Sequence, residues 1–162
     1  MKEHSEEEKK IWLKTLIRKR FAAGVILKNQ DNEWLLVKTG YHKGKYTFVG
    51  GHAEAHESPK KTAEREAQEE IGLCISVGNL LTCTYVSNKN LKDEIIIFYF
   101  DGGVVSSDQV EHIAYEDGEI EEYIFVSEED VMKYLRPELR DTYEAIRESY
   151  QSEKAVFLEF EK

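Results

Sequence analysis

The feature of this sequence that most constrains its fold is a predicted helix with three carboxylates on one face. Glu66, Glu69 and Glu70 occupy positions i, i+3 and i+4, and at about 100° per residue they fall within about 100° of arc. The neighbouring stripe is small and apolar, and it consists of Ala63, Ala67 and Ile71. Because such a stripe lets the helix press against a sheet, we expect the carboxylates at the edge of a packed face.

The residues at both ends of this helix favour its formation. Ser58 is a good N-cap, and Pro59 suits the first helical position. Gly72 can end the helix, since glycine accepts the left-handed conformation at this position without strain. The helix is therefore predicted between Ser58 and Gly72.

The acidic face by itself has two interpretations. A solvated face is one, because repulsion between exposed carboxylates on a helix costs only about 0.2–0.5 kcal/mol per pair. A metal site is the other, since the repulsion rises to about 3 kcal/mol per pair at an effective dielectric constant of about 20, and a cation offsets it. The residues that surround the triplet decide between the two.

Segments around this helix alternate between strand-like and helical patterns. Strands are predicted over residues 21–28, 33–38, 46–49 (ending at Gly50-Gly51), 73–86, 94–100 and 121–126. Further helices are predicted over residues 5–17 and 137–149 and, after an N-cap at Ser127, in a short segment, whereas 155–160 is ambiguous. This order predicts an α/β fold with helices packed on a mixed sheet, in a single domain spanning residues 1–162.

The N-terminal helix is predicted from a capping signal. Ser5 and Glu8 have the spacing of a capping box, and Ile11, Trp12 and Leu16 form an apolar stripe. The charged start MKEHSEEEKK lacks the apolar stretch of a signal peptide, and no run approaches the ~18 apolar residues of a membrane span. We therefore expect a cytoplasmic protein without a membrane partner.

Net charge restricts the class of partner. The chain has 22 Lys and Arg against 32 Asp and Glu, a formal net charge of −10, and it has no basic block that would neutralise a nucleic-acid backbone. Long DNA or RNA is therefore not an expected partner. A small phosphate ligand stays compatible, because a bound divalent cation reverses the sign of the charge locally.

A longer motif surrounds the acidic face. Residues 51–73 read GHAEAHESPKKTAEREAQEEIGL, in which a glycine, a glutamate and the run Arg65-Glu66-x-x-Glu69-Glu70-x-Gly72 stand at fixed spacing. This stretch resembles the Nudix box in full, and the hairpin before it and the acidic strand after it also resemble the layout of that family. The resemblance implies a Nudix-type α-β-α sandwich, with a mixed β-sheet between helices.

The resemblance also implies roles for residues of the box. The implied ligands of Mg²⁺ or Mn²⁺ are hard oxygen donors, namely the carbonyl of Gly51 and the carboxylates of Glu66, Glu69 and Glu70. Glu69 is in addition a candidate general base. Arg65 and Glu57 resemble the pair that braces the loop against the helix, and contact with the substrate is the alternative role for Arg65.

The box departs from the commonest family pattern at two places. Val49 stands where a proline often precedes the paired glycines, and Ala55-His56 stands where Pro-Gly often precedes Glu57. Neither position carries a metal-binding side chain in the family. The departures therefore concern loop shape and substrate preference rather than the chemistry.

Outside the box, an acidic cluster leads into the last predicted strand. It consists of Glu116, Asp117, Glu119, Glu121 and Glu122. Family members often place a general base or an extra metal ligand near this point, and Glu119 and Glu122 are the best matches. Glu119 is favoured because a position just ahead of the strand can reach across a cleft, and a solvated loop is the alternative interpretation.

Some residues near the box are candidates for substrate contact. Lys43, Lys45 and Tyr46 can bind phosphate and stack on a base, although surface positions would explain them equally. His52 and His56 flank the glycine loop, and we expect them to be polar loop residues rather than metal ligands.

The function implied by the resemblance is metal-dependent hydrolysis of a diphosphate linkage in a nucleoside diphosphate linked to another moiety, with a nucleoside triphosphate as the first candidate substrate. The alternatives are an ADP-ribose or nucleotide-sugar pyrophosphatase and a catalytically silent nucleotide-sensing module. A sensor would be expected to lack box carboxylates, and here all are present.

The isomerase branch of the family needs a cysteine ahead of the box, whereas Cys74 and Cys83, expected to be buried and reduced, follow it. The expected partner is a small nucleotide-like diphosphate, and the choice between a monomer and a homodimer stays open.

Overall fold

The computed structural model describes residues 5–40, 44–115 and 119–161, so that Lys43, Glu116 and Asp117 lie outside the described residues. The strands of this part of the chain are β1 (Arg20–Lys28), β2 (Trp34–Thr39), β3 (Tyr46–Thr47), β4 (Val49–His52), β5 (Leu80–Asn88), β6 (Asp93–Val104), β7 (Ile120–Val126) and β8 (Val156–Glu161). The helices are α1 (Glu6–Thr15), α2 (Pro59–Ile71), α3 (Ser107–Glu111), α4 (Val131–Tyr134), the 3₁₀ helix η2 (Pro137–Leu139) and α5 (Arg140–Ser152).

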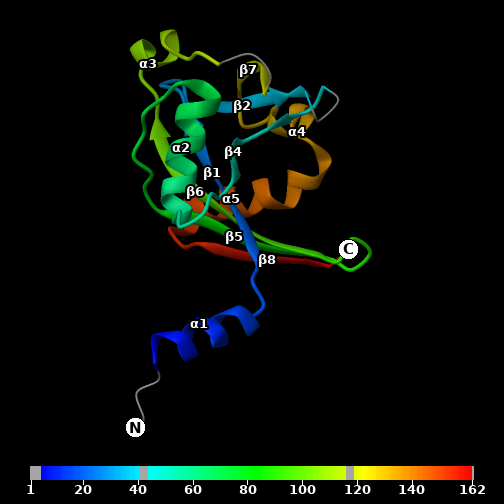
Figure 1. The fold of residues 1–162 in the computed structure, drawn as a ribbon. Coiled ribbons are helices and arrows are strands. Elements are labelled where there is room, and N and C mark those ends of the chain that lie inside the picture. Colours follow the sequence, from blue (N-terminus) through cyan, green and yellow to red (C-terminus); the bar gives the residue numbers. More distant parts are fainter. Residues whose placement is uncertain (1–4, 41–43, 116–118, 162) are drawn as a thin grey trace.

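All of these strands join one mixed sheet. Its main path runs β3-β2-β1-β6-β5-β8, while β4 pairs with β1 and β7 pairs with β2. The pairs β1–β6 and β5–β8 are parallel, and the other pairs are antiparallel. Figure 1 shows β2 and β7 toward one end of the sheet and β5 and β8 toward the other.

The first two strands start as a hairpin and then part. β1 and β2 pair at Lys28 and Trp34, beside the predicted loop, where the Asn29 N–H donates to the Glu33 carbonyl over 2.9 Å. Farther from this loop, β1 pairs with β4, whereas β2 pairs with β3 and β7. The sheet therefore opens into two wings, one built on β1 and the other on β2.

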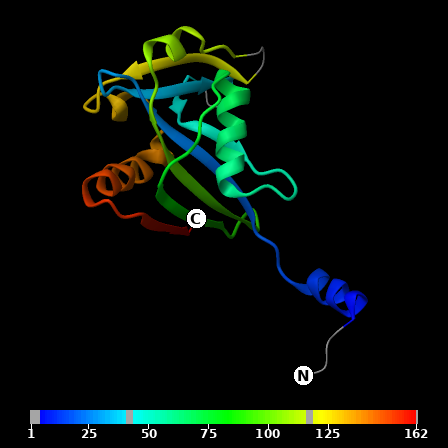
Figure 2. The same cartoon turned by 90° about the vertical axis from the view of Figure 1, so that its left-hand side faces the viewer.

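Helices cover both faces of the sheet (Figures 1 and 2). α2 packs on β1 and β4 through its apolar stripe, in which Ala63, Ala67 and Ile71 are fully buried. On the other face, α5 packs on β5 and β8, and its Tyr143 and Ile146 join a core with Trp34. This arrangement confirms the predicted α/β fold with a mixed sheet between helices.

The caps of α2 are those that the sequence predicts. The Ser58 side chain accepts a hydrogen bond from the Lys61 N–H over 3.4 Å, and Pro59 is the first helical residue. Gly72 has φ of 73°, and its N–H donates to the carbonyls of Ala67 and Gln68. These caps fix the length of the helix that carries the acidic face.

The strand predicted over residues 46–49 is interrupted. It consists of β3 and β4, and Gly50 and Gly51 lie inside β4 rather than after a strand. The reason is cross-strand pairing, since Gly50 lies opposite Gly24 of β1, where the two backbones approach closely. The glycine pair is therefore part of the sheet.

The strand predicted over residues 73–86 begins only at Leu80. In the preceding segment, Leu73 and Val77 are buried in the core below α2, so their apolar character reflects packing rather than strand pairing. Cys74 of this segment is exposed, contrary to the expected burial, and Cys83 of β5 is half-buried; both are free thiols.

Three further elements differ in detail near the C-terminal end. α4 begins at Val131 after Asp130, because the Ser127 carbonyl first closes a turn by accepting from the Asp130 N–H over 2.9 Å. The helix predicted over 137–149 consists of η2 and α5, and the ambiguous tail is β8, parallel to β5. α3 has no counterpart among the predicted elements.

α1 forms as predicted, and both hydrogen bonds of its capping box are present between Ser5 and Glu8. None of its residues is buried, so the predicted apolar stripe of this helix faces solvent in a single copy. Figures 1 and 2 show α1 set apart from the sheet and joined to it through the start of β1. Within the described residues, no helix has the length and hydropathy that crossing a membrane requires.

The close approach of β1 and β4 predicts a strong effect of a methyl group at Gly50. This residue has φ of 148°, and a Cβ there would lie 2.4 Å from the Cα of Gly24. We expect Gly50→Ala to lower the free energy of unfolding in urea by about 1–3 kcal/mol. At Gly40 a Cβ would meet only Glu121 Oε1, at 3.3 Å, so Gly40→Ala should change stability by less than about 0.5 kcal/mol. Equal effects at the two positions would contradict this account.

Candidate active site

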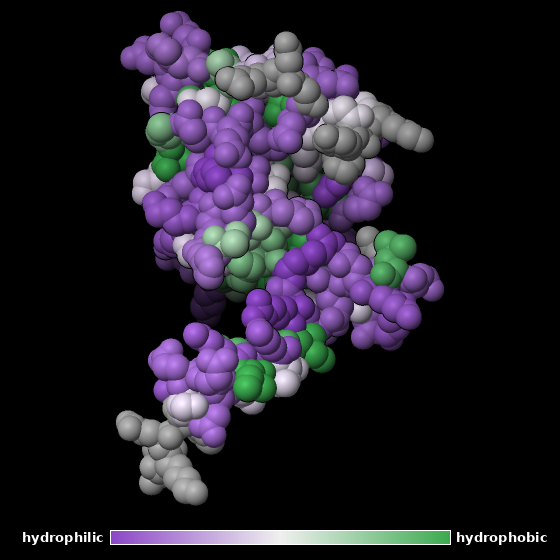
Figure 3. Space-filling view, in the orientation of Figure 1, coloured by the Kyte–Doolittle hydropathy of each residue, from purple (hydrophilic) through white to green (hydrophobic). Residues whose placement is uncertain are grey.

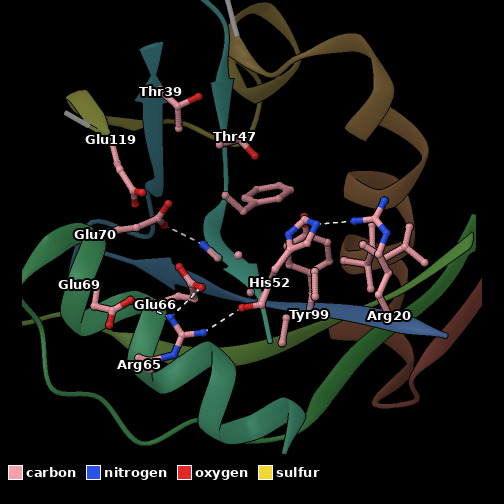
Figure 4. Close-up of a pocket in the computed structure, with 18 of the residues that line it drawn as sticks. Arg20, Thr39, Thr47, His52, Arg65, Glu66, Glu69, Glu70, Tyr99 and Glu119 are labelled. Carbon is pink, nitrogen blue, oxygen red and sulfur yellow. Dashed lines mark hydrogen bonds and ion pairs between the residues drawn. The ribbon is translucent and has the colours of Figure 1, made fainter. Parts of the chain in front are cut away.

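A cavity of about 680 Å³ lies where the two wings of the sheet part, and its size suits a small-molecule ligand. One side is formed by the acidic face of α2, as Figure 4 shows. The remaining lining comes from both wings and includes Ala22, Gly24, Thr39, Thr47, Phe48, Tyr99 and Glu119. The cavity therefore brings together segments that are far apart in the sequence.

The three glutamates of α2 differ in burial. Glu66 and Glu70 are 8% and 7% exposed, whereas the side chain of Glu69 is 55% exposed. Burial raises the pKa of Glu66, and the charge of Arg65 opposes this rise. Two of the carboxylates thus lie at the edge of a packed face, as the helix pattern predicts, and the face is not simply solvated.

Arg65 connects four groups around its guanidinium. Its Nη1 donates to Glu66 Oε1 over 2.9 Å and to Glu69 Oε2 over 2.7 Å. Its Nε donates to Glu57 Oε1 over 2.9 Å, and its Nη2 donates to Glu57 Oε2 over 3.1 Å and to the carbonyl of His52 over 2.9 Å. The arginine therefore ties α2 to β4 and to the loop that joins them.

Glu57 holds the other side of this network. Besides the paired contact with Arg65, its Oε2 accepts from the Glu54 N–H over 3.0 Å and from the Thr62 hydroxyl over 2.9 Å. The hydrogen bonds from Arg65, together with those from Glu54 and Thr62, lower the pKa of Glu57 to about 2. Glu57 and Arg65 are therefore in direct contact, and their role in bracing the loop stays a prediction.

Glu70 joins the helix to the glycine pair of β4. Its Oε2 accepts from the Gly50 N–H over 2.8 Å. Burial raises the pKa of Glu70 to about 8, a rise that the Gly50 N–H opposes and to which the charges of Glu66, Glu119 and Glu69 add. Without a cation, this carboxyl therefore has a large neutral fraction at neutral pH.

Gly51 lies against Glu66. A Cβ at position 51 would be 2.4 Å from Glu66 Oε1 and 2.5 Å from Glu66 Cδ. Only glycine lets the carboxylate come this close to the backbone of β4. The close approach of the Glu66 carboxylate, a candidate metal ligand, thus explains why residue 51 is a glycine.

Glu119 and Glu122 have different positions. Glu119 lines the cavity from the β2 wing and points toward Glu70 (Figure 4). Glu122 lies on β7 outside the lining, where its Oε2 accepts from the Tyr46 hydroxyl over 2.8 Å and lies 3.8 Å from Lys38 Nζ. Of the two carboxylates named outside the box, the structure brings only Glu119 together with the glutamates of α2.

The two candidate substrate residues within the described chain do not line the cavity. Lys45 is exposed, and Tyr46 is buried, with its hydroxyl bound to Glu122 and its ring 5.8 Å from the ring of Tyr134. His52 does line the cavity, beside the guanidinium of Arg20, whereas His56 has a left-handed backbone at φ of 67°.

Several lining residues have no signal in the sequence. Arg20, Thr39, Thr47, Phe48, Tyr99 and Arg136 all line the cavity. The Oγ1 of Thr39 is buried and has no hydrogen-bond partner, so it can receive a polar group of a ligand. Ala22 and Gly24 on β1 lie opposite Ile97 and Tyr99 of β6, and the Tyr99 ring lies against Gly24, where a Cβ would be 2.7 Å from Tyr99 Cε1. This register could not be read before the strand pairing was known.

The carboxylates suit a hard divalent cation by their chemistry. Within residues 5–40, 44–115 and 119–161, His, Cys, Asp and Glu side chains form no ready-made cluster of three or more ligands, because Glu66 and Glu69 bind Arg65 and Glu70 binds Gly50. Nevertheless, Glu66 and Glu70 are buried next to one another, and the pKa of Glu70 is raised by burial and further by the charges of Glu66, Glu119 and Glu69. Mg²⁺ or Mn²⁺ prefers such oxygen donors and would offset these charges.

Comparison with known proteins identifies the family of the chain and structures with a similar fold. The NUDIX domain model matches residues 18–146. A MutT protein from Methanosarcina mazei Go1 has a TM-score of 0.69 at 24% identity, over 84% of this chain and 99% of that one. A UDP-X diphosphatase has a TM-score of 0.67 at 19% identity, over 96% and 76%. An ADP-ribose pyrophosphatase from Streptococcus suis has a TM-score of 0.61 at 16% identity, over 88% and 100%. No curated protein matches by sequence.

The fold and the acidic site define a hydrolase that acts on phosphoric anhydrides. The chain belongs to the Nudix family, because the family model covers most of its length. The named structures are each below 25% identical to this chain, so their likeness establishes the fold only.

The network around Glu57 predicts a dependence of stability on pH. The pKa of Glu57 falls from an ordinary 4.5 to about 2 on folding, so its ionised form stabilises the protein above pH 4.5 and this contribution is lost as pH falls toward 2. Glu57→Gln should therefore lower the free energy of unfolding by at least about 1.5 kcal/mol at neutral pH. The difference from the wild type should shrink as pH falls through this window, as measured by urea unfolding.

Glu54→Gln is the matched control, because the Glu54 side chain is exposed and its hydrogen bonds with Glu57 are made by its backbone N–H and carbonyl. It should leave stability within about 0.5 kcal/mol of the wild type. A Glu57→Gln difference that stays constant down to pH 2 would contradict the proposed pairing.

Proposed function

We propose that the protein hydrolyses a diphosphate linkage in a small nucleotide-like substrate and that this activity depends on Mg²⁺ or Mn²⁺. The observation that carries the proposal is the arrangement of carboxylates around one cavity. Glu66, Glu69 and Glu70 line it from α2, and Glu119 faces them from the other wing. Such a cavity can hold cations and the diphosphate to which they bind.

Residues of this chain would hold the metal through oxygen atoms. The donors that we assign are the carboxylates of Glu66, Glu69 and Glu70 and the carbonyl of Gly51. When bound there, Mg²⁺ or Mn²⁺ neutralises charge that develops on the phosphate oxygens and lowers the pKa of a bound water. Arg65 keeps Glu66 and Glu69 in place through its hydrogen bonds, and Glu57 keeps Arg65 in place.

A carboxylate must accept the proton of the attacking water. We assign this role to Glu119, because it lines the cavity and has no part in the Arg65 network. Glu122 is second, since its Oε2 is committed to the Tyr46 hydroxyl. If neither acts, Glu69 takes the role, because its side chain is the most exposed of the three on α2.

The substrate class follows from the site and from the relatives. We propose nucleoside triphosphates first, with ADP-ribose and nucleotide sugars as alternatives, since similar structures include a MutT protein, an ADP-ribose pyrophosphatase and a UDP-X diphosphatase. The products would be a nucleoside monophosphate with pyrophosphate or a phosphorylated group. Lys45 and Tyr46 stay candidates for substrate contact only if their segment moves toward the cavity.

The rival function is a nucleotide sensor without catalysis. It is disfavoured because Glu57, Arg65 and the three glutamates of α2 are all present and all make contacts around the cavity. Isomerase chemistry is disfavoured because neither Cys74 nor Cys83 lines the cavity. We further propose that residues 1–162 form one domain and that the protein acts in the cytoplasm on small molecules rather than on long nucleic acid.

Metal dependence is tested on a panel of nucleotide substrates. Activity should vanish after chelation and return with Mg²⁺ or Mn²⁺, and either ion should raise the melting temperature, because a ligand that binds only the folded state stabilises it. Glu70→Gln and Glu69→Gln should each lower turnover by at least ~10²-fold, whereas Glu54→Gln should leave it near wild type. Full activity in excess chelator would reject the metal site.

The general base is tested by comparing two substitutions. We expect Glu119→Gln to lower kcat by ~10²-fold or more while metal affinity is kept, since a base acts on the proton and not on the ion. Glu122→Gln should have the smaller effect, through loss of its bond to Tyr46. If both variants stay within about threefold of wild type, the base lies inside the box.

A further inference from the structure

Two apolar surfaces of the chain are uncovered in a single copy. The first is α1 with the residues that follow it. The exposed fractions are 60% for Ile11, 60% for Trp12, 47% for Leu13, 44% for Leu16 and 86% for Ile17, and Figure 3 shows such side chains on the outside of this helix. An isolated helix of 10 residues is only marginally stable in water. α1 therefore needs a surface to pack on.

The second surface is one face of the sheet at β6, β5 and β8. Residues directly opposite one another in a sheet point to the same face, and two such rows can be followed across the strands. Phe98 lies opposite Cys83, which lies opposite Phe157, and in the next row Ile96 lies opposite Tyr85. Phe157 is 63% exposed, and the other four are half-buried. α2 covers β1 and β4 beside this face, and α5 covers the opposite face of β5 and β8. We call these five residues the open sheet face.

We propose that two copies of this chain form a symmetric dimer, in which α1 of each copy packs on the open sheet face of the other. The two surfaces complement each other, because α1 is a helix with exposed large apolar side chains and the open sheet face is an apolar part of the sheet that none of the described helices covers. A two-fold axis would let both exchanges form at once, as a closed assembly requires.

The hinge between α1 and β1 favours exchange over folding back within one chain. Leu16 ends the helix in an extended conformation, with ψ of 138°. Lys19 binds Glu94 and Arg20 binds Asp93, so the start of β1 is held on β6. Only Ile17 and Arg18 remain for a reversal, and neither is a glycine, proline, asparagine or aspartate that a tight turn favours. Short hinges of this kind promote exchange between copies.

The charges of α1 are divided along its length. Glu6, Glu7 and Glu8 form its first turn, whereas Lys9, Lys10 and Lys14 follow, beside the apolar residues. On β8, Glu159 lies on the same face as Phe157, in the row of Tyr85, while Glu161 is paired with Lys89. The basic part of α1 of one copy would therefore lie next to Glu159 of the other, which sets the direction of the helix on the open sheet face.

Light scattering on the full chain tests the dimer. We expect the wild type to have twice the mass of one chain, and both Trp12→Glu with Leu16→Glu and the separate variant Phe157→Glu to have the mass of one chain. Val104→Glu is the matched control, because Val104 is 61% exposed but lies at the far end of β6, and it should remain a dimer. A monomeric wild type at high concentration would overturn the proposal. Circular dichroism checks that each variant folds, since none of these side chains is buried.

Cross-linking identifies what covers the open sheet face. One sample carries Leu13→Cys, Cys74→Ser and Cys83→Ser, and a second carries Cys74→Ser and keeps Cys83. After mixing and treatment with a short bifunctional maleimide, we expect a covalent pair of unlike chains. A chain with both Leu13→Cys and Cys83 that cross-links only within itself would instead show folding back and overturn the exchange.

Trp12 reports the same event by fluorescence. It is 60% exposed, whereas Trp34, the other tryptophan, is 1% exposed. On dimerisation its emission should shift to shorter wavelength as the protein concentration rises, and Phe157→Glu should abolish the shift. A shift that requires vesicles of anionic lipid and occurs in monomers would overturn the proposal in favour of a membrane surface.

Discussion

The guanidinium of Arg65 is the group on which the rest of the site depends. It touches two carboxylates of its own helix, the carboxylate of Glu57 and the carbonyl of His52. Without it, the helix would carry closely spaced negative charges at the edge of a packed face, where water screens them poorly. Its five donors have fixed directions, so the same contacts that balance charge also set the position of α2 relative to β4.

The sheet supplies the space that this network borders. Because β1 pairs with β4 and β2 pairs with β7, the strands of the first hairpin separate, and the cavity lies between the wings. Two glycines of β4 let this strand approach β1 and α2 closely. Gly50 faces Gly24 across the ladder, and Gly51 faces the carboxylate of Glu66. Backbone and acidic face thus meet without an intervening side chain.

The negative charge of the protein affects how a negatively charged substrate can bind in the cavity. The net charge of −10 repels a polyphosphate, and the cavity is lined by four glutamates against three arginines, Arg20, Arg65 and Arg136. Within the protein itself, burial raises the pKa of Glu70, and the charges of Glu66, Glu119 and Glu69 add to this rise. Under the proposed function, a diphosphate substrate would therefore enter with divalent cations, and the metal would be needed for binding as well as for chemistry.

The sequence by itself determined the helix and its acidic face. Ser58, Gly72 and the spacing of the glutamates act within one or two turns, so local rules suffice to place them. It also determined the pairing of Arg65 with Glu57, since both lie in the same box. The sequence favoured Glu119 over Glu122, but only the tertiary structure decided that Glu119 lines the cavity and Glu122 does not, because the pairing of β7 with β2 sets the position of each side chain. The same holds for Thr39, Tyr99 and Arg136, which share a cavity but no motif. The apolar stripe of α1 predicted a helix but not the surface on which this helix packs. That surface depends on where the folded chain, or a second copy of it, places other exposed apolar residues.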